Sequence, residues 1–344
     1  MPPNQLYSAA PDSCDKISGM HPASKIREMS PTVAVIIWAG LIALGVALGL
    51  ILGFGGFRFA AAMIVCAVLL AGHIFPAAPR IRTRLLRTLG KRGAIAVLVP
   101  LGAFVVYSAA VAGNWKTALA GAAYVLLPTL VLIGVSRNER ATIVDYIAVL
   151  LIWLPVEFRW MYKLLPYPPP LMHTLTILLA VNTALAAFLY SRQLGGIGYA
   201  VEWRRGFAMA IGFNFLVFIA IAIPLGEALG FLHFAPSLSR LRSIPLAVVG
   251  IFFFTAWPEE LLFRGLLQNL LTKSLKNEWA GLIAAALVFG ASHLNNGGFP
   301  NWRYGILATI AGIFYGRAWI KTGSLLPGAI VHALVDILWH ILFP

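Results

Sequence analysis

Cysteine and charged residues are scarce in this chain. Only two cysteines, Cys14 and Cys66, occur among 344 residues, which excludes a disulfide framework and a zinc ribbon. Charged residues make up 11% of the chain and hydrophobic residues 60%, with a mean hydropathy of +0.85. No soluble globular domain has such a composition, so the chain belongs in a membrane.

The start of the chain lacks the short apolar core and the small-residue cleavage site of a cleaved signal peptide. Residues 1–30 are instead polar and mixed in charge. We therefore expect residues 1–30 to form a disordered cytoplasmic tail.

Apolar runs of membrane-spanning length fill the rest of the sequence. They fall near residues 32–54, 57–75, 94–112, 117–135, 142–156, 171–190, 206–226, 244–271, 279–293, 304–320 and 325–342. Between them, residues 227–243 are too polar to span, and four prolines between residues 166 and 170 exclude a continuous helix. The sequence predicts an all-α, polytopic transmembrane helical bundle of about eleven spans. Its expected partner is therefore the lipid bilayer.

The positive charge of the chain follows its predicted topology. Its net charge of +14 would suit nucleic acid, but the basic residues lie mainly in short links between apolar runs. This is the pattern of the positive-inside rule, so we expect no nucleic-acid partner. We expect an integral protein of the bacterial cytoplasmic membrane with a cytoplasmic N-terminus. The most basic link, residues 80–92, fits either an amphipathic helix on anionic lipid or a solvated loop.

Two adjacent carboxylates and a guanidinium interrupt the apolar run 244–271. Charge at bilayer depth is costly and needs a partner or a wet cavity. Glu260 and Arg264 are one helical turn apart, which suits an ion pair, whereas Glu259 points to another face. We therefore assign Glu260 and Arg264 to architecture and Glu259 to chemistry. Pro258 predicts a bend or a local opening of the helix beside them.

Three further ionisable residues lie in the last hundred residues of the chain, on other apolar runs. They are His293, His332 and Asp336, the last one turn after His332. At 1.5 Å per residue, Glu259, His293 and His332 lie roughly 21, 22 and 13 Å from the presumed cytoplasmic ends of their helices. All three depths fall inside a core of about 30 Å, so these side chains meet if their helices pack together.

Such a set of side chains supports two chemistries. A buried glutamate near an imidazole acts as a general base on water, and a second imidazole stabilises an oxyanion. Alternatively, Glu259, His293 and His332 would bind a divalent metal such as zinc. The sequence contains no HExxH motif, which is the usual zinc-protease signature. We expect no cofactor, with zinc as the open alternative.

From residue 244 onward the chain resembles the CAAX prenyl endopeptidase and bacteriocin-processing family of intramembrane proteases, known as Abi or CPBP. Its Glu-Glu-x-x-x-Arg motif stands at Glu259, Glu260 and Arg264; its Phe-x-x-x-His motif stands at Phe289 and His293; its last motif stands at His332 and Asp336. The resemblance implies a glutamate-type endopeptidase that hydrolyses a peptide bond of a membrane-associated peptide or protein. It implies that Glu259 and His293 activate water.

By the same resemblance, His332 and residue 336 form the oxyanion site, while Glu260, Arg264 and Phe289 support it. CAAX-processing members have Asn where this chain has Asp336. An ionised aspartate would repel an oxyanion, so Asp336 either orients His332 or is protonated.

These observations divide the chain into three parts. We expect a tail (1–30), N-terminal transmembrane helices of unknown role (31–243) and a four-helix catalytic core (244–344). In the N-terminal part, Asp145, Glu157 and Asn182 are isolated polar residues, which we assign to packing or to the interface. Two other functions remain open: a non-catalytic immunity or scaffold protein of the same fold, and a proton-coupled transporter.

Overall fold

The computed structural model describes residues 26–135 and 140–343. Each predicted apolar run forms a helix in it, so the all-α, polytopic prediction is confirmed. Within the described residues, eight helical stretches are long and apolar enough to cross a membrane: Pro31–Ile51, Gly56–Ala77, Pro79–Val111, Trp115–Leu132, Pro169–Ser191, Phe207–Ala228, Ser239–Leu275 and Leu325–Leu342. The other three predicted runs form two helices of 15 residues and one helix with three basic residues. The total of eleven spans therefore stays a prediction.

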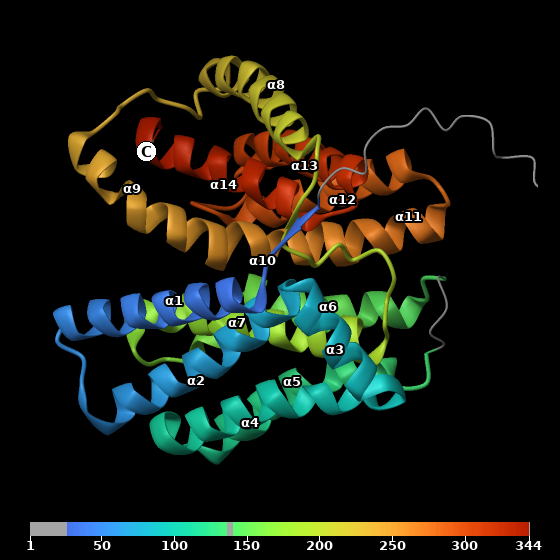
Figure 1. The fold of residues 1–344 in the computed structure, drawn as a ribbon. Helices are drawn as coiled ribbons and strands as arrows, with labels where there is room; N and C mark the ends of the chain where they lie inside the picture. Colours follow the sequence, from blue (N-terminus) through green and yellow to red (C-terminus); the bar gives the residue numbers. More distant parts are fainter. Residues whose placement is uncertain (1–25, 136–139, 344) are drawn as a thin grey trace, which may run out of the picture.

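Two layers of helices are stacked on each other (Figure 1). The N-terminal layer contains α1 (Pro31–Ile51), α2 (Gly56–Ile74), α3 (Pro79–Leu89), α4 (Leu98–Tyr107), α5 (Trp115–Leu132), α6 (Ile143–Glu157) and α7 (Met172–Ala184). The C-terminal layer contains α8 (Phe207–Ala228), α9 (Leu238–Ile251), α10 (Trp257–Glu260), α11 (Asn269–Leu275), α12 (Glu278–Ser292), α13 (Trp302–Thr322) and α14 (Leu325–Leu342).

Shorter helical turns extend or connect these helices. The 3-10 segments are Phe75–Ala77, Gly90–Val97, Trp160–Lys163, Pro169–Leu171 and His293–Asn295. The wide π-helical turns are Ser108–Ala112, Leu185–Ser191, Phe252–Ala256 and Leu261–Gln268. The proline-rich segment between α6 and α7 holds two of the 3-10 turns and no long helix, as predicted.

A rod formed by α9, α10, α11 and the two π turns between them lies at the boundary of the two layers (Figure 1). Its side chains enter both hydrophobic cores: Trp257 and Leu261 pack into the core of the N-terminal layer, and Phe263 and Leu267 into that of the C-terminal layer. The rod begins at Leu238, six residues before the predicted start, because the polar segment 238–243 forms its first turns. The rod therefore fixes how the two layers meet.

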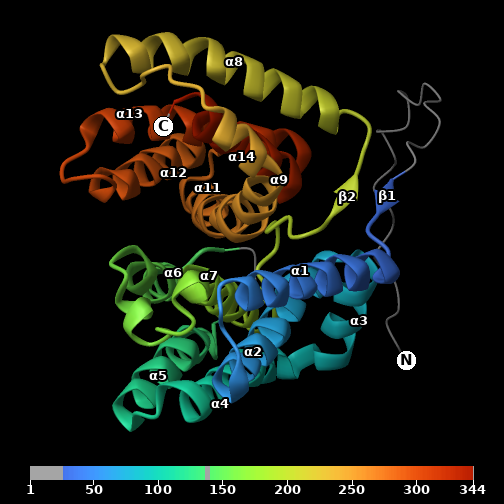
Figure 2. The same cartoon turned by 90° about the vertical axis from the view of Figure 1, so that its left-hand side faces the viewer.

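The first described residues join the two halves of the chain. β1 (Arg27–Glu28) pairs antiparallel with β2 (Glu202–Trp203), in the link that leads from the N-terminal to the C-terminal layer (Figure 2). Met29 N–H also donates to the Val201 carbonyl. Residues 1–25 of the predicted tail lie outside the described residues, and its last residues are extended and paired instead of disordered.

The basic link after α2 is a helix, α3, and not a solvated loop. Its apolar residues Ile81, Leu85, Leu86 and Leu89 pack against the core of the N-terminal layer. Most of its basic residues are exposed. The amphipathic alternative is therefore the one that the fold supports.

Side-chain caps set the short turns between the last three long helices. The side chain of Asn277 accepts a hydrogen bond from Ala280 N at the start of α12, and Asn301 accepts one from Tyr304 N at the start of α13. Ser324 does the same for Leu326 N at the start of α14. Such caps satisfy free N–H groups at helix starts, so α12, α13 and α14 begin at defined residues.

The helices α12 and α13 approach closely at Gly290, where small residues allow two backbones to pack. A Cβ atom at Gly290 would lie 2.5 Å from the Gly305 carbonyl oxygen and 1.8 Å from Thr309 Oγ1. We expect Gly290→Ala to destabilise the protein by about 1–3 kcal/mol through overpacking. The measurement is the thermal unfolding midpoint in detergent. The matched control is Gly212→Ala in α8, where nothing lies within 4 Å of the added atom, and equal midpoints for the two variants would contradict the prediction.

Candidate active site

Pro258 shapes the rod at the candidate site. Proline has no N–H group to donate to the carbonyls one turn earlier. Here the rod widens into π turns on both sides of the short helix α10, over Phe252–Ala256 and Leu261–Gln268, and continues as one rod. The predicted local opening is present. Glu259 and Glu260 follow Pro258 and, as neighbours on a helix, point to different faces.

Glu260 is fully buried, and its Oε1 oxygen is bonded. Arg264 Nη1 donates to Glu260 Oε1 at 2.8 Å, and Arg264 Nη2 donates to the Gly312 carbonyl oxygen on α13 at 3.1 Å. The two side chains are 0% and 1% exposed. The predicted i,i+4 ion pair is therefore present, and it ties the rod to α13.

Two aromatic rings enclose the Arg264 guanidinium. Its Cζ atom lies 4.5 Å from the centre of the Phe289 ring and 5.2 Å from that of Tyr315. Cation–π contacts of this kind stabilise a desolvated cation. Phe289 also packs against both histidines, with ring centres 4.6 Å from His293 and 5.8 Å from His332. Phe289 thus connects the charge pair with both imidazoles.

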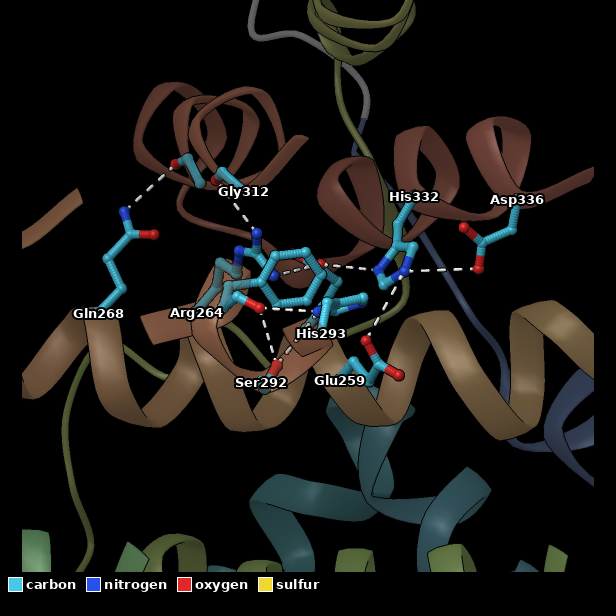
Figure 3. Close-up of polar contacts among 11 residues, drawn as sticks. Glu259, Arg264, Gln268, Ser292, His293, Gly312, His332 and Asp336 are labelled. Carbon is cyan, nitrogen blue, oxygen red and sulfur yellow. Dashed lines mark hydrogen bonds and ion pairs between the residues drawn. The ribbon is translucent and has the colours of Figure 1, made fainter. Parts of the chain in front are cut away.

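His332 lies among three carboxyl groups (Figure 3). Its Nδ1 is 3.0 Å from Glu260 Oε1, and its Nε2 is 3.5 Å from Asp336 Oδ2 and 3.8 Å from Glu259 Oε2. Because Arg264 pairs with Glu260, that carboxylate accepts, and Nδ1 of His332 donates. The Tyr315 ring stacks on the imidazole at 4.5 Å. The bond to Glu260 and the stacked Tyr315 ring thereby fix the orientation of the imidazole. Its Nε2 faces Glu259 and Asp336.

Glu259 and Asp336 differ from Glu260 in their exposure. Their side chains are 31% and 33% exposed, whereas that of Glu260 is 0% exposed. Neither has an ion pair shorter than 3.5 Å within the described part of the chain. Both carboxyl groups are therefore open to water or to a ligand, and Glu260 is not.

His293 follows directly after α12, as the first residue of a 3-10 turn. Its Nδ1 lies 2.7 Å from the Phe289 carbonyl oxygen. A carbonyl only accepts, so Nδ1 carries the proton and Nε2 keeps its lone pair in the neutral ring. The ring packs edge-on against Tyr304 with centres 4.7 Å apart. The backbone thus selects the tautomer in which Nε2 can take up a proton.

Two cavities meet the candidate residues. One, of about 230 Å³, is lined by Glu259 and His293 together with residues of both layers. The other, of about 240 Å³, is lined by His293, His332 and Asp336 within the C-terminal layer. The predicted residues from three helical segments are therefore brought together, as the depth estimate required. His293 borders both cavities.

The metal alternative needs a ligand set. Among residues 26–135 and 140–343, no group of three or more His, Cys, Asp or Glu side chains is arranged to hold a metal ion. The metal-dependent alternative at Glu259, His293 and His332 therefore stays a prediction, which chelators can test.

Sequence reasoning missed the wall that the N-terminal layer gives to the first cavity. Trp153, Glu157 and His173 line it opposite Glu259. Trp153 Nε1 donates to Glu157 Oε2 at 3.1 Å, so Glu157 is part of a cavity wall and not an isolated packing residue. Tyr304 was missed too, because an aromatic residue in an apolar run resembles ordinary filling.

The two other isolated polar residues have packing roles. Asp145 pairs with Arg192 at 2.9 Å, with both side chains 0% exposed, and it completes a capping box with Thr142 at the start of α6. Asn182 Nδ2 donates to the carbonyls of Leu69 and Leu178. These contacts hold α6, α7 and α2 together, as the packing assignment predicted.

Comparisons with known proteins agree with the position of this site. Neither the curated proteins nor the solved structures gave a match to the chain. Residues 240–338, which carry every candidate residue above, match the model of the family described as Type II CAAX prenyl endopeptidase Rce1-like, and this match confirms that the C-terminal third is similar to that family of proteases.

Proposed function

We propose that this integral membrane protein is an intramembrane endopeptidase that hydrolyses a peptide bond of a membrane-associated peptide or protein. One observation carries the proposal: of two adjacent glutamates, Glu260 is buried and paired, whereas Glu259 is 31% exposed on a cavity that it shares with His293. A carboxylate with a free face beside an imidazole is suited to activate water.

In the first step, water binds between Glu259 and His293 in this cavity. Glu259 takes one proton of the water, and the resulting hydroxide attacks the carbonyl carbon of the scissile bond. The neutral His293 accepts the second O–H of the water at Nε2, since its Nδ1 is held by the Phe289 carbonyl. The C=O electron pair moves to oxygen, which gives a tetrahedral oxyanion.

In the second step, His332 stabilises the oxyanion. Glu260 fixes its Nδ1, so a proton on Nε2 points toward Glu259 and Asp336, where the oxyanion would form. A donor placed before the reaction costs little reorganisation, and one such donor contributes about 10²–10³-fold to kcat. Asp336, at 3.5 Å from Nε2, acts on His332 as a positioning residue rather than as a donor.

In the last step, the tetrahedral intermediate collapses. The proton held by Glu259 passes to the nitrogen of the leaving amine, the C–N bond breaks and the C=O bond forms again. Glu259 returns to its ionised form. The step needs no covalent enzyme intermediate, because the nucleophile is water throughout.

The N-terminal layer has a part in this proposal. Because its residues Trp153, Glu157 and His173 line the cavity opposite Glu259, it would present the substrate to the core. We further propose that the protein lies in the bacterial cytoplasmic membrane with its N-terminus in the cytoplasm, as its basic links indicate.

The experiment that tests this function is proteolysis of a library of membrane-proximal peptides by the purified protein in detergent. Mass spectrometry of the products identifies new termini. We expect defined cleavage by the native chain and none by Glu259→Gln. A folded native chain that cleaves no peptide in the library, in detergent or in proteoliposomes, would favour the non-catalytic scaffold or immunity role.

Chelators distinguish the side-chain mechanism from its metal-dependent alternative. Because the proposed mechanism activates water with side chains alone, we expect 1,10-phenanthroline and EDTA to leave the cleavage rate unchanged within about twofold. The measurement is the initial rate with and without chelator, followed by addition of zinc. A rate that falls with chelator and recovers with zinc would contradict the side-chain mechanism.

A further inference from the structure

We propose that the N-terminal layer binds one anionic phospholipid, with an acyl chain in an apolar cavity beside α3 and the phosphate at the basic residues that border it. This site is separate from the candidate active site. It lies between α1, α2, α4 and the π turn Leu185–Ser191.

The cavity is large and almost entirely apolar. It measures about 740 Å³, and its walls include Leu85 and Leu89 of α3 and the rings of Trp38 and Phe75. Two of the polar side chains on its wall are already bonded inside the protein: Trp38 Nε1 donates to the Ala67 carbonyl, and the Asn182 amide donates to two backbone carbonyls. A cavity of this kind excludes water and accepts an apolar guest.

The mouth of the cavity faces the lipid side of the protein. Five of its lining residues are large hydrophobic side chains that are between 40% and 61% exposed: Ile64, Val68, Ile95, Leu98 and Val99. Exposed apolar side chains on a membrane helix are in contact with acyl chains. An acyl chain can therefore enter the cavity directly from the bilayer.

Two basic residues stand near the α3 end of this cavity, within a strongly basic stretch of the chain. Residues 79–98 contain six basic and no acidic residues. Lys91 and Arg92 are exposed and stand between Leu89 and Ile95, which both line the cavity. On the other face of α3, Arg80, Arg84 and Arg87 border a separate hollow together with Glu28.

The apolar cavity and the basic residues near it together favour one kind of ligand. An apolar chain alone would need no basic rim, and a free phosphate would need no apolar cavity. Basic pockets between transmembrane helices bind anionic head groups. An anionic glycerophospholipid meets both requirements at once.

The test is native mass spectrometry of the full-length protein in non-ionic detergent with added phosphatidylglycerol or phosphatidylcholine. We expect phosphatidylglycerol to bind about tenfold more tightly than phosphatidylcholine, from one to two favourable charge contacts. Arg92→Glu should remove this preference. Arg242→Glu, an exposed charge reversal on α9 far from the cavity, should keep it.

A second pair of variants tests the cavity. Val99→Trp places a bulky ring at the mouth, whereas Val106→Trp does so seven residues later on the same helix, at a residue of similar exposure, 49% against 50%, that does not line the cavity. We expect Val99→Trp, but not Val106→Trp, to weaken binding of both lipids about tenfold or more. If Val99→Trp does not fold, Ile64→Trp on α2 blocks the same mouth.

Three results would overturn the proposal. They are equal affinity of the native protein for the two lipids, equal lipid binding by Val99→Trp and Val106→Trp, and displacement of phosphatidylglycerol by millimolar inorganic phosphate. The last result would mean that the basic residues bind phosphate without a chain in the cavity.

Discussion

Glu259→Gln is expected to lower kcat for peptide-bond hydrolysis by about 10²–10⁴-fold, the range for loss of a general base. Glutamine keeps the size and shape of the side chain but cannot take a proton from water at neutral pH. Because the Glu259 side chain is 31% exposed and, among residues 26–135 and 140–343, has no ion pair shorter than 3.8 Å, its replacement should leave the fold intact. The measurement is single-turnover cleavage of a peptide substrate in detergent.

The matched control is Glu278→Gln, which removes an exposed carboxylate from the start of α12. It should cleave at the native rate. The thermal unfolding midpoints of both variants should equal that of the native chain. A Glu259→Gln protein that turns over within tenfold of the native rate would show that another group activates the water.

The fold and the first half of the site follow from local sequence. Apolar runs predict helices because a chain in lipid must satisfy its own backbone. The Glu260–Arg264 pair follows from their spacing of four residues on one helix. These features need no knowledge of which helices are neighbours, and the structure confirms them.

Contacts between residues of different helices could not be predicted from local sequence in this way. The bond between Glu260 and His332 joins residues 72 positions apart, and the wall formed by Trp153 and His173 comes from the other layer. A helix pattern gives the face of a residue, but not the helix that covers this face. The π turns beside Pro258 also depend on packing, because proline permits a kink, a break or a widened turn.

The resemblance to a known family has the same limit, because it does not reveal contacts with the N-terminal layer. The family match covers residues 240–338. It therefore includes His293, His332 and the carboxylates beside them, but not the N-terminal layer. Only the structure places Glu157 on the cavity that Glu259 shares with His293. The part of the site in the C-terminal layer could therefore be predicted from motifs, whereas the part in the N-terminal layer is known only from the structure.

Arg264→Met is expected to lower the free energy of unfolding by about 3–5 kcal/mol, the usual cost of removing one partner of a buried ion pair. Methionine fills much of the same volume but leaves the Glu260 carboxylate, 0% exposed, without its guanidinium. It also removes the bond to the Gly312 carbonyl and the contacts with the rings of Phe289 and Tyr315. Reversible unfolding in mixed micelles measures the loss.

The control for this change is Arg317→Met on α13. Arg317 bonds the Asn214 side chain and packs on the Phe213 ring. It is only half-buried, and within the part of the chain that the structure describes it has no ion pair with a carboxylate. Its loss should cost less, about 1.5 kcal/mol, the lower end of the range for a hydrogen bond to a charged group. In the double variant Glu260→Gln/Arg264→Met, no charge is left uncompensated, so stability should recover by 1 kcal/mol or more relative to Arg264→Met. A double variant that is less stable than Arg264→Met would contradict this prediction. Glu260 would then stabilise the fold chiefly through His332, and the ion pair would not be the main bond between the rod and the rest of the C-terminal layer.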